Sequence, residues 1–225
     1  MAWRCTGATN SALVDNLLGA RIIAHERVVA AMRRVDRAHF APHSPYEDAP
    51  QYIGYGATIS APHMHGYALE HLRHHLQPGM RALDVGSGSG YLAACMAEMV
   101  GAEGHVVGID HIPELVRGSE DALERHYPEW VRSRRVQLVV GDGRHGYADG
   151  APYDCIHVGA AAPETPTELL SQLKAPGRMF VPVGTAGQNI IVYDKDHSGH
   201  VTERSVMAVR YVPLTDADKQ RDDDM

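Results

Sequence analysis

A glycine-rich segment that follows a short apolar run constrains the fold of this chain more than any other feature. Residues 81–85 (RALDV) have the composition of a β-strand, residues 86–90 read GSGSG, and helix-forming residues follow from Tyr91. Glycine is favoured where φ is positive or where a ligand approaches the backbone closely. The order therefore predicts a strand, a tight ligand-binding turn and a helix, as in α/β sheets that bind nucleotides.

The details of this turn indicate which ligand it binds. In the dinucleotide fingerprint G-x-G-x-x-G the third glycine would stand at Tyr91, whereas here it comes one residue early. No lysine follows the turn, so it does not match a phosphate-binding P-loop. The carboxylate of Asp84, at the end of the strand, would repel a phosphate and attract an ammonium group. S-adenosylmethionine carries an ammonium group and no phosphate, and the turn favours this cofactor.

Three successive predicted strands each end in an aspartate: Asp84, Asp110 and Asp142. Asp110 comes 20 residues after Gly90, the spacing at which a βαβ unit delivers an acid to ribose hydroxyls. One such aspartate would be an ordinary helix cap. Three of them beside a glycine-rich turn predict a nucleoside site at the carboxyl ends of the strands.

The pattern of apolar segments predicts the fold class. Two short helices are expected within residues 10–37, irregular chain over 41–60, and a helix from Pro62 to about residue 76. Beyond residue 80, strands and helices alternate, which predicts a mostly parallel, twisted α/β sheet of about seven strands covered by helices. The expected strands lie near 81–85, 105–109, 136–140, 153–158, 178–183, 189–194 and 205–212, and the expected helices near 89–99, 112–126 and 164–174.

The end of this sheet is expected to be antiparallel. Only a short polar turn, Asp196 to Gly199, separates the last two predicted strands, and a parallel crossover needs a dozen or more residues. We therefore expect one domain over 1–225. Residues 1–78 would form an N-terminal helical cap on the substrate side, and residues 79–225 the cofactor-binding core with a C-terminal hairpin.

Composition limits the partners. The 225 residues carry a formal net charge of −7, whereas nucleic-acid binding needs a basic face. No run approaches the ~20 apolar residues of a membrane span, and the N-terminus lacks a signal-peptide pattern. The three cysteines form no paired framework, which suits a reducing compartment. We expect a cytoplasmic monomer that binds neither nucleic acid nor membrane.

The 15 histidines raise the possibility of a metal site. His63 and His65, or His71 and His75 at helical spacing, could pair as ligands. Neither pair has a convincing third ligand, and the H-E-x-x-H motif is absent, so no metal is expected.

Several segments together resemble the protein-L-isoaspartate (D-aspartate) O-methyltransferase family, and in particular its animal-type members. The resemblance covers nearly the whole chain. Segment 57–65 is the most specific, because general methyltransferases lack it, and the glycine-rich turn is shared more widely. The matching segments are 1–4 (MAWR), 57–65 (ATISAPHMH), 83–90 (LDVGSGSG), 139–144 (VVGDGR), 156–163 (IHVGAAAP) and 211–216 (YVPLTD).

The resemblance implies a Rossmann-like class I methyltransferase fold and a repair activity. Such an enzyme transfers a methyl group from S-adenosylmethionine to the free carboxylate of L-isoaspartyl residues in damaged proteins and leaves S-adenosylhomocysteine. The ester then closes to a succinimide, which reopens partly to L-aspartyl. Whether D-aspartyl residues are accepted stays open.

The resemblance also implies roles for individual residues. Ser60 is expected to be catalytic and to bind substrate as well as cofactor, while Asp84 holds the methionine ammonium group and Asp110 the ribose. Asp142 is expected to accept from the adenine amino group. The other expected cofactor residues are Ala57, Thr58, Ile59, His65, Gly86, Ser87, Gly88, His111, Gly143, Thr215 and Gln220, and the peptide groove is bordered by Val212, Pro213 and Leu214.

Two other functions remain as alternatives. One is methylation of a small carboxylate on the same fold, against which the intact segment 57–65 argues. The other is a non-catalytic adaptor that binds the cofactor, against which Ser60 and the three strand-end aspartates argue. The chain departs from the family where Lys174 to Arg178 reads KAPGR in place of KPGGR, and the segment from Gly184 to Tyr193 is slightly shorter.

Overall fold

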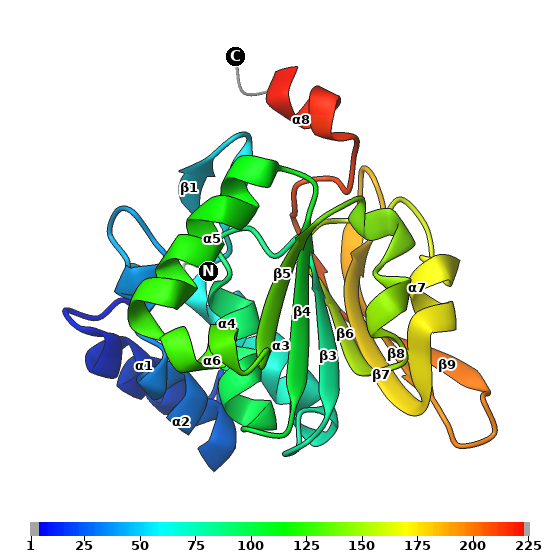
Figure 1. Cartoon of the computed structure of the whole chain (residues 1–225), viewed down its shortest axis with the longest axis horizontal. Coiled ribbons are helices and arrows are strands. Elements are labelled where there is room, and N and C mark those ends of the chain that lie inside the picture. Colours follow the sequence, from blue (N-terminus) through cyan, green and yellow to red (C-terminus); the bar gives the residue numbers. More distant parts are fainter. Residues whose placement is uncertain (1–4, 223–225) are drawn as a thin grey trace.

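The computed structural model describes residues 5–222, so the matching segment 1–4 lies outside the described residues. A seven-stranded sheet runs through the molecule in the order β5-β4-β3-β6-β7-β8-β9, and a separate hairpin pairs β1 with β2 (Figure 1). The strands are β1 Gln51–Gly54, β2 Ala57–Ile59, β3 Arg81–Val85, β4 His105–Asp110, β5 Val136–Val140, β6 Tyr153–Val158, β7 Leu173–Val183, β8 Gln188–Lys195 and β9 Val201–Val209.

Helices connect and cover these strands. The α-helices are α1 Asn10–Gly19, α2 Glu26–Arg34, α3 Pro62–Leu72, α4 Tyr91–Val100, α5 Pro113–His126, α6 Pro128–Arg132, α7 Thr167–Gln172 and α8 Ala217–Asp222. Short 3-10 turns are η1 Arg37–His39, η2 Arg73–His75, η3 Gly143–His145 and η4 Ala148–Gly150.

The strand order explains where the site forms. The chain moves outward from β3 through β4 to β5 and then returns to the other side of β3 as β6. All pairs from β5 to β7 are parallel, whereas β7–β8 and β8–β9 are antiparallel. The predicted mostly parallel sheet with an antiparallel end is confirmed. The reversal of direction at β3 leaves a crevice at the carboxyl ends of the strands, where ligands bind in sheets of this kind.

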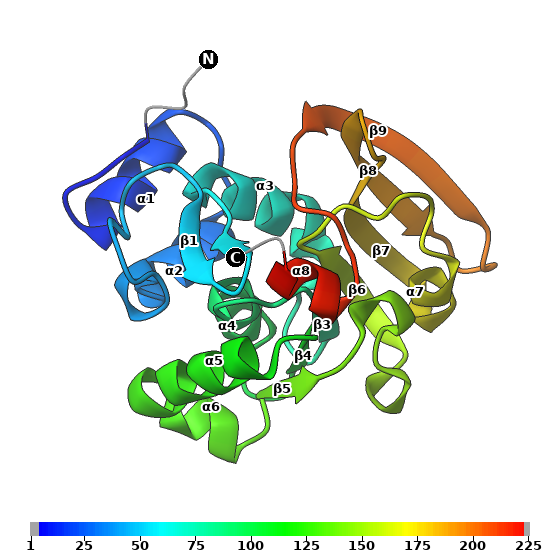
Figure 2. The same cartoon turned by 90° about the horizontal axis from the view of Figure 1, so that it is seen from above.

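The helices lie on both faces of the sheet. Helices α1 to α6 lie on one side and α7 on the other (Figures 1 and 2). All residues of α4 except Glu98 are buried, because its sequence is apolar on every side and it lies between the sheet and α2. The glycine-rich turn is thus fixed between a central strand and a fully buried helix.

The prediction of irregular chain over 41–60 is wrong in part. Residues 51–59 form the β1–β2 hairpin, whose turn is built by Gly54, Tyr55 and Gly56 with φ of 94°, 56° and 66°. The glycines mark this turn, and the strands beside it are only four and three residues long. Strands so short carry little apolar periodicity that a sequence pattern could reveal.

Several further elements differ from those expected: among them, the last strand is β9 at Val201–Val209 rather than near 205–212, and α8 was not expected. The helix expected over 164–174 is limited to α7, and β7 begins at Leu173 rather than near residue 178. Leu173 is buried and pairs with Tyr153 of β6, so pairing across the sheet extends the strand at the expense of the helix. The five-residue helix α6 was not expected and begins at Pro128, which suits the first turn of a helix.

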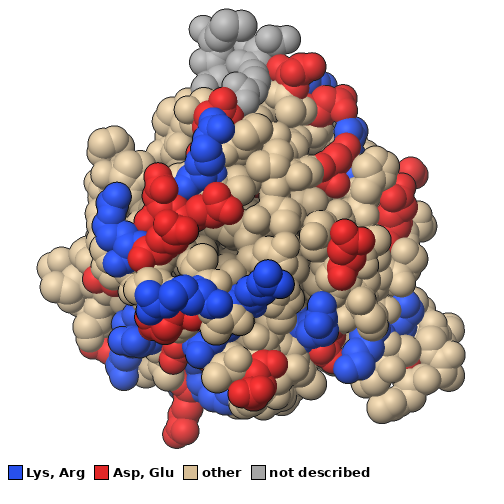
Figure 3. Space-filling model, viewed as in Figure 1, with Lys and Arg blue, Asp and Glu red and all other residues tan. Residues whose placement is uncertain are grey.

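The C-terminal segment returns to the centre of the molecule. Seen from above, α8 lies over the ends of the central strands (Figure 2). On the face viewed in Figure 3, acidic and basic side chains are interspersed. Among residues 5–222, no helix combines the length and apolar character needed to cross a membrane.

Candidate active site

The glycine-rich turn has the backbone conformation that its sequence predicts. Gly86, Gly88 and Gly90 have φ of 72°, 52° and 81°, values that L side chains rarely adopt. A Cβ on Gly159, at the end of β6, would lie 3.0 Å from the Gly86 carbonyl oxygen. The close approach of the two neighbouring strand ends therefore leaves little room for a side chain at Gly159.

Asp110 fixes the geometry of the turn. Its Oδ2 accepts a hydrogen bond from the Gly88 N–H at 2.9 Å, and its Oδ1 accepts one from the Ile112 N–H at 3.0 Å. Burial raises the pKa of the Asp110 carboxyl despite these bonds. The side chain is thus an anchored acceptor at the end of β4, as the sequence predicts for a ribose site.

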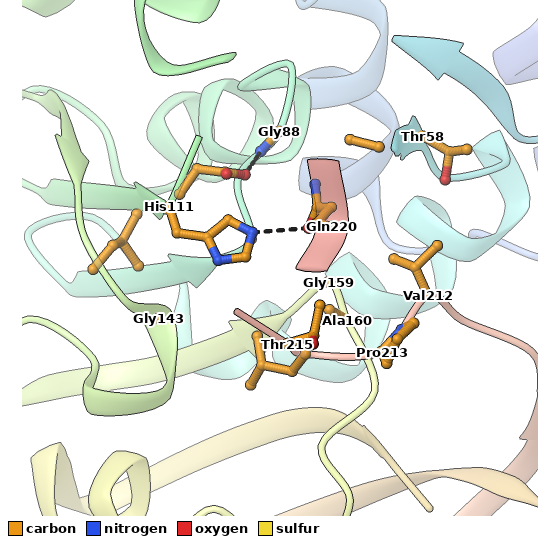
Figure 4. Close-up of a pocket in the computed structure, with 15 residues that line it drawn as sticks. Thr58, Gly88, His111, Gly143, Gly159, Ala160, Val212, Pro213, Thr215 and Gln220 are labelled. Atoms are coloured by element: carbon orange, nitrogen blue, oxygen red, sulfur yellow. Dashed lines mark hydrogen bonds between the residues drawn. The ribbon is translucent and has the colours of Figure 1, made fainter. Parts of the chain in front are cut away.

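A narrow cavity of about 60 Å³ lies between these strand ends and the C-terminal segment (Figure 4). Gln220 of α8 crosses it: His111 Nε2 donates to Gln220 Oε1 at 2.8 Å, and Gln220 Nε2 donates to the Tyr55 carbonyl at 2.8 Å. The lining residues come from seven parts of the chain and are Ala57, Thr58, Gly86, Gly88, Ile109, Asp110, His111, Gly143, Gly159, Ala160, Val212, Pro213, Leu214, Thr215 and Gln220.

The structure brings most of the predicted cofactor residues to this cavity, Thr215 and Gln220 among them. The predicted peptide-groove residues Val212, Pro213 and Leu214 line it as well. Sequence reasoning missed Ile109, Gly159 and Ala160. The last two stand in the 156–163 segment that carries the family resemblance, which was the available indication of their position.

Asp84 does not line this cavity. Its side chain is buried, and its Oδ1 is 2.7 Å from Nδ1 of His157 on the neighbouring strand β6. A buried carboxylate needs such a partner. The sequence predicted the acid and missed its histidine.

The Ser87 hydroxyl tests whether the turn suits a bound nucleoside. Ser87 is 8% exposed, and its buried Oγ has no hydrogen-bond partner among the residues that the structure describes. A buried polar atom without a partner is unfavourable unless a ligand or water satisfies it. The Ser87 side chain does not line the cavity and lies close to Gly108 of β4, so the fit rests on the positive-φ glycines and the fixed Asp110 carboxylate, which suit a turn that accepts the polar groups of S-adenosylmethionine.

Asp142 faces the C-terminal segment. Arg144 Nη2 lies 2.6 Å from Asp142 Oδ2 and 2.5 Å from Asp216 Oδ1, and these bonds lower the pKa of the Asp142 carboxyl. The pair ties the chain after β5 to the segment before α8. Gly143 lines the cavity, whereas the Asp142 carboxylate is engaged by Arg144. The adenine contact of Asp142 stays a prediction.

A second, wider cavity of about 660 Å³ adjoins the first and shares Thr58, Gly159 and Val212 with it. Ser60 lines this second cavity only. Its other lining residues come from the chain before β1, from α3 and the residue before it, and from the end of β9 and the residues after it: Pro50, Ala61, His63, Met64, Tyr67, Met207, Ala208, Val209, Arg210 and Tyr211. Ser60 therefore lies in a wide groove at the boundary with the narrow cavity.

Two residues that the sequence did not single out hold Ser60. Arg37 Nη2 donates to the Ser60 carbonyl at 2.8 Å, and the Ser60 side chain hydrogen-bonds to Tyr211. Burial raises the pKa of the Tyr211 phenol to about 12, against the opposing effect of Ser60, so the phenol stays protonated. Gln188 fixes the Tyr211 backbone on both sides, at 2.6 Å to its N–H and 3.1 Å to its carbonyl.

Ile59 and His65 are buried beside the two cavities. Ile59 is 3% exposed and belongs to the hydrophobic core. His65 is 7% exposed, packs against the Tyr91 ring and lies 3.1 Å from an Arg37 nitrogen. Neither lines the cavities described above, so their contacts with a cofactor stay predictions.

The strand order, the glycine turn with its facing aspartate and the adjoining groove define a Rossmann-like S-adenosylmethionine-dependent methyltransferase. Solved structures agree: a Plasmodium falciparum chain named as a protein-L-isoaspartate O-methyltransferase in complex with S-adenosylhomocysteine superposes with a TM-score of 0.87. It is 32% identical, and the match covers 93% of this chain and 99% of that one.

Sequence comparisons define the family. The model of the protein-L-isoaspartate(D-aspartate) O-methyltransferase family matches residues 8–219. A Caenorhabditis elegans protein-L-isoaspartate O-methyltransferase is 51% identical over 221 residues, with 98% of both chains covered. A Triticum aestivum protein of the same name is 52% identical over 217 residues, with 95% of this chain and 94% of that one covered. The chain belongs to the protein-L-isoaspartate (D-aspartate) O-methyltransferase family.

Proposed function

We propose that this chain methylates the free α-carboxylate of L-isoaspartyl residues in damaged proteins and peptides, and that Ser60 positions that carboxylate. One observation carries the assignment of Ser60. It lines the wide groove, which shares Thr58, Gly159 and Val212 with the narrow cavity. A group held at Ser60 would therefore lie next to a cofactor in the narrow cavity.

S-adenosylmethionine, when bound, supplies the methyl group from its sulfonium. The protein's residues then orient the acceptor and exclude water. An α-carboxyl group has a pKa of about 3.5 and is ionised at neutral pH, so no general base is needed. The Ser60 hydroxyl fixes the carboxylate by a hydrogen bond, and proximity accounts for most of the rate enhancement.

The narrow cavity holds the cofactor in this proposal. Asp110 binds the ribose hydroxyls, Gly86, Ser87, Gly88 and Gly143 offer backbone or hydroxyl groups, and Gln220 covers the cofactor. Asp84 acts on the methionine ammonium group from below the turn. His111 and Thr215 contact the cofactor from the sides of the cavity.

The wide groove takes the peptide. It runs along the end of β9, an edge strand of the sheet, towards the exposed Val212. An edge strand presents unpaired backbone groups to an extended peptide, which gives affinity with little dependence on side chains. This suits a substrate that occurs in many different sequences.

The proposal assigns residues 1–78 to the substrate side and 79–225 to the cofactor core and hairpin, acting together as one domain in a monomer. It also places the protein in the cytoplasm. In support of a reducing compartment, all three cysteines are buried and unpaired.

Methyl transfer to matched peptides tests the function. Two synthetic peptides would differ only in one L-isoaspartyl or L-aspartyl residue, and a third would carry D-aspartyl at that position. We expect base-labile methyl ester on the isoaspartyl peptide and none on the L-aspartyl peptide. Labelling of both L-peptides, or of neither despite cofactor binding, would contradict the proposal, and labelling of small carboxylates alone would favour the first alternative.

A further inference from the structure

A fully buried arginine lies behind Ser60. Arg37, in η1, has no exposed surface. Its Nη2 donates to the Ser60 carbonyl at 2.8 Å, its Nη1 is 3.1 Å from His65 Nδ1, and its buried Nε has no partner in the described part of the chain. The guanidinium thus joins the two predicted site residues that flank the start of α3.

The charge of Arg37 lacks a directly bonded counterion. Within residues 5–222, no carboxylate oxygen lies within 4.0 Å of its guanidinium. Asp48 acts on it only at longer range, and the Asp48 carboxylate is bound by the His63 ring at 2.8 Å and by the His63 N–H at 3.0 Å. The Tyr91 ring, 5.2 Å from the guanidinium carbon, offsets part of the cost of burial.

The contact with Arg37 also defines the state of His65. A guanidinium has only donors, so His65 Nδ1 must accept, and the ring proton is on Nε2. Burial, followed by the nearby Arg37 charge, holds the pKa of His65 well below its usual value. The imidazole is therefore neutral, and it leaves the Arg37 charge uncompensated.

A buried cation without a bonded anion is unfavourable unless an anion binds nearby. Each substrate of the proposed function brings one, the isoaspartyl α-carboxylate, to the Ser60 hydroxyl. Low polarity around the guanidinium strengthens its attraction for that carboxylate across the short 58–60 segment.

We propose that Arg37 is a positioning residue of the methyl-acceptor subsite, which holds the Ser60 backbone, fixes the His65 tautomer and favours an anionic acceptor through its buried charge. This inference rests on the proposed function. It adds a source of selectivity for the carboxylate, which the Ser60 hydroxyl alone does not provide.

A binding experiment without turnover tests the role of the charge. With S-adenosylhomocysteine present, calorimetry would compare an isoaspartyl peptide with its α-carboxamide analogue. We expect the wild type to bind the carboxylate peptide about 30-fold more tightly than the carboxamide, since hydrogen bonds and electrostatic interactions with a charged group are stronger than those with a neutral one. In Arg37→Gln this preference should fall below about 5-fold, while the carboxamide affinity changes about 2-fold or less.

Arg27→Gln is the matched control. Arg27 also donates to two backbone carbonyls, those of Leu76 and Met99, but does so at the junction of α2, η2 and α4, away from both cavities. Its substitution should lower the melting temperature and leave the preference for the carboxylate intact. Arg37→Lys keeps the charge and loses the two-pronged geometry, so it should keep most of the preference and lower kcat.

Two outcomes separate the hypotheses. If the wild type prefers the carboxylate and Arg37→Gln prefers it equally, Arg37 has no electrostatic role. If the wild type has no preference at all, the proposed function itself fails. Nitrogen-15 NMR of the wild-type His65 ring, which depends on no variant, should show the neutral Nε2–H form, and a protonated Nδ1 would overturn the assignment.

Discussion

The two adjoining cavities are built in different ways. One part of the narrow cavity of about 60 Å³ is made at the strand ends, by the glycine turn and an aspartate fixed by backbone N–H groups, and its other lining residues come from segments near Thr58 and Gln220. The wide groove of about 660 Å³ is made from side chains that lie about 150 residues apart, near Ser60 and near Tyr211. Binding of the cofactor should therefore depend on local geometry, and binding of the peptide on long-range packing.

The largest expected effect is the loss of cofactor affinity in the narrow cavity when Asp110 is substituted. Asp110→Asn removes the charge and one of the two acceptors that hold the Gly88 and Ile112 N–H groups. Loss of charge-assisted bonds worth about 2–3 kcal/mol should weaken S-adenosylhomocysteine binding about 100-fold in calorimetry. Asp121→Asn, on the exposed side of α5, is the control and should leave binding unchanged. An equal loss of affinity in the two variants would contradict the role given to Asp110.

Ser60→Ala should lower activity on the peptide, which binds in the groove, and leave cofactor binding in the narrow cavity unchanged. We expect kcat/KM for an isoaspartyl peptide to fall about 30-fold, because loss of a hydrogen bond to a charged group costs about 2 kcal/mol. Affinity for S-adenosylhomocysteine should change about 2-fold or less, since the hydroxyl lies in the groove. A matching loss of cofactor affinity would show that the two cavities are one functional unit.

Tyr211→Phe should also act in the wide groove, with a smaller effect on activity than Ser60→Ala. It removes the hydroxyl group that hydrogen-bonds to Ser60 and keeps the partly buried ring. A neutral hydrogen bond contributes about 1 kcal/mol, so kcat should fall about 5-fold with little change in the melting temperature. Tyr193→Phe, which removes a similar bond to Thr165 at 2.8 Å, is the control and should leave kcat unchanged.

Lowering the pH should destabilise the fold through His65, which lies beside the groove, and this is the smallest of the expected effects. The pKa of His65 is held well below 6.5 in the folded protein, so below pH 6.5 the unfolded chain binds a proton that the folded one does not. This contribution to stability is complete above pH 6.5 and is lost as the pH falls, by about 1 kcal/mol per pH unit. Denaturant unfolding from pH 7.5 to 5.5 should show a shallower loss in His65→Gln. Parallel curves would mean that the pKa of His65 is the same in the folded and unfolded protein.

The sequence by itself determined the parts of the molecule in which neighbours in the chain are neighbours in space. These parts are all local patterns: the glycine turn, the aspartates at or just after the ends of β3, β4 and β5, and the alternation of strands and helices. Each follows from backbone sterics or from the periodicity of side chains along a strand or helix. The antiparallel end of the sheet was predictable because a four-residue turn cannot form a crossover.

Only the tertiary structure decided which distant groups meet. Three contacts join segments that are 23 to 151 positions apart in the sequence. They are the contacts of His157 with Asp84, of Tyr211 with Ser60, and of Arg37 with both Ser60 and His65. No local pattern marks such pairs, because their contact depends on how the sheet twists and how helices pack on it. Their energies are set by burial, which raises the cost of an unpaired charge or hydroxyl and so decides which partners each group must have.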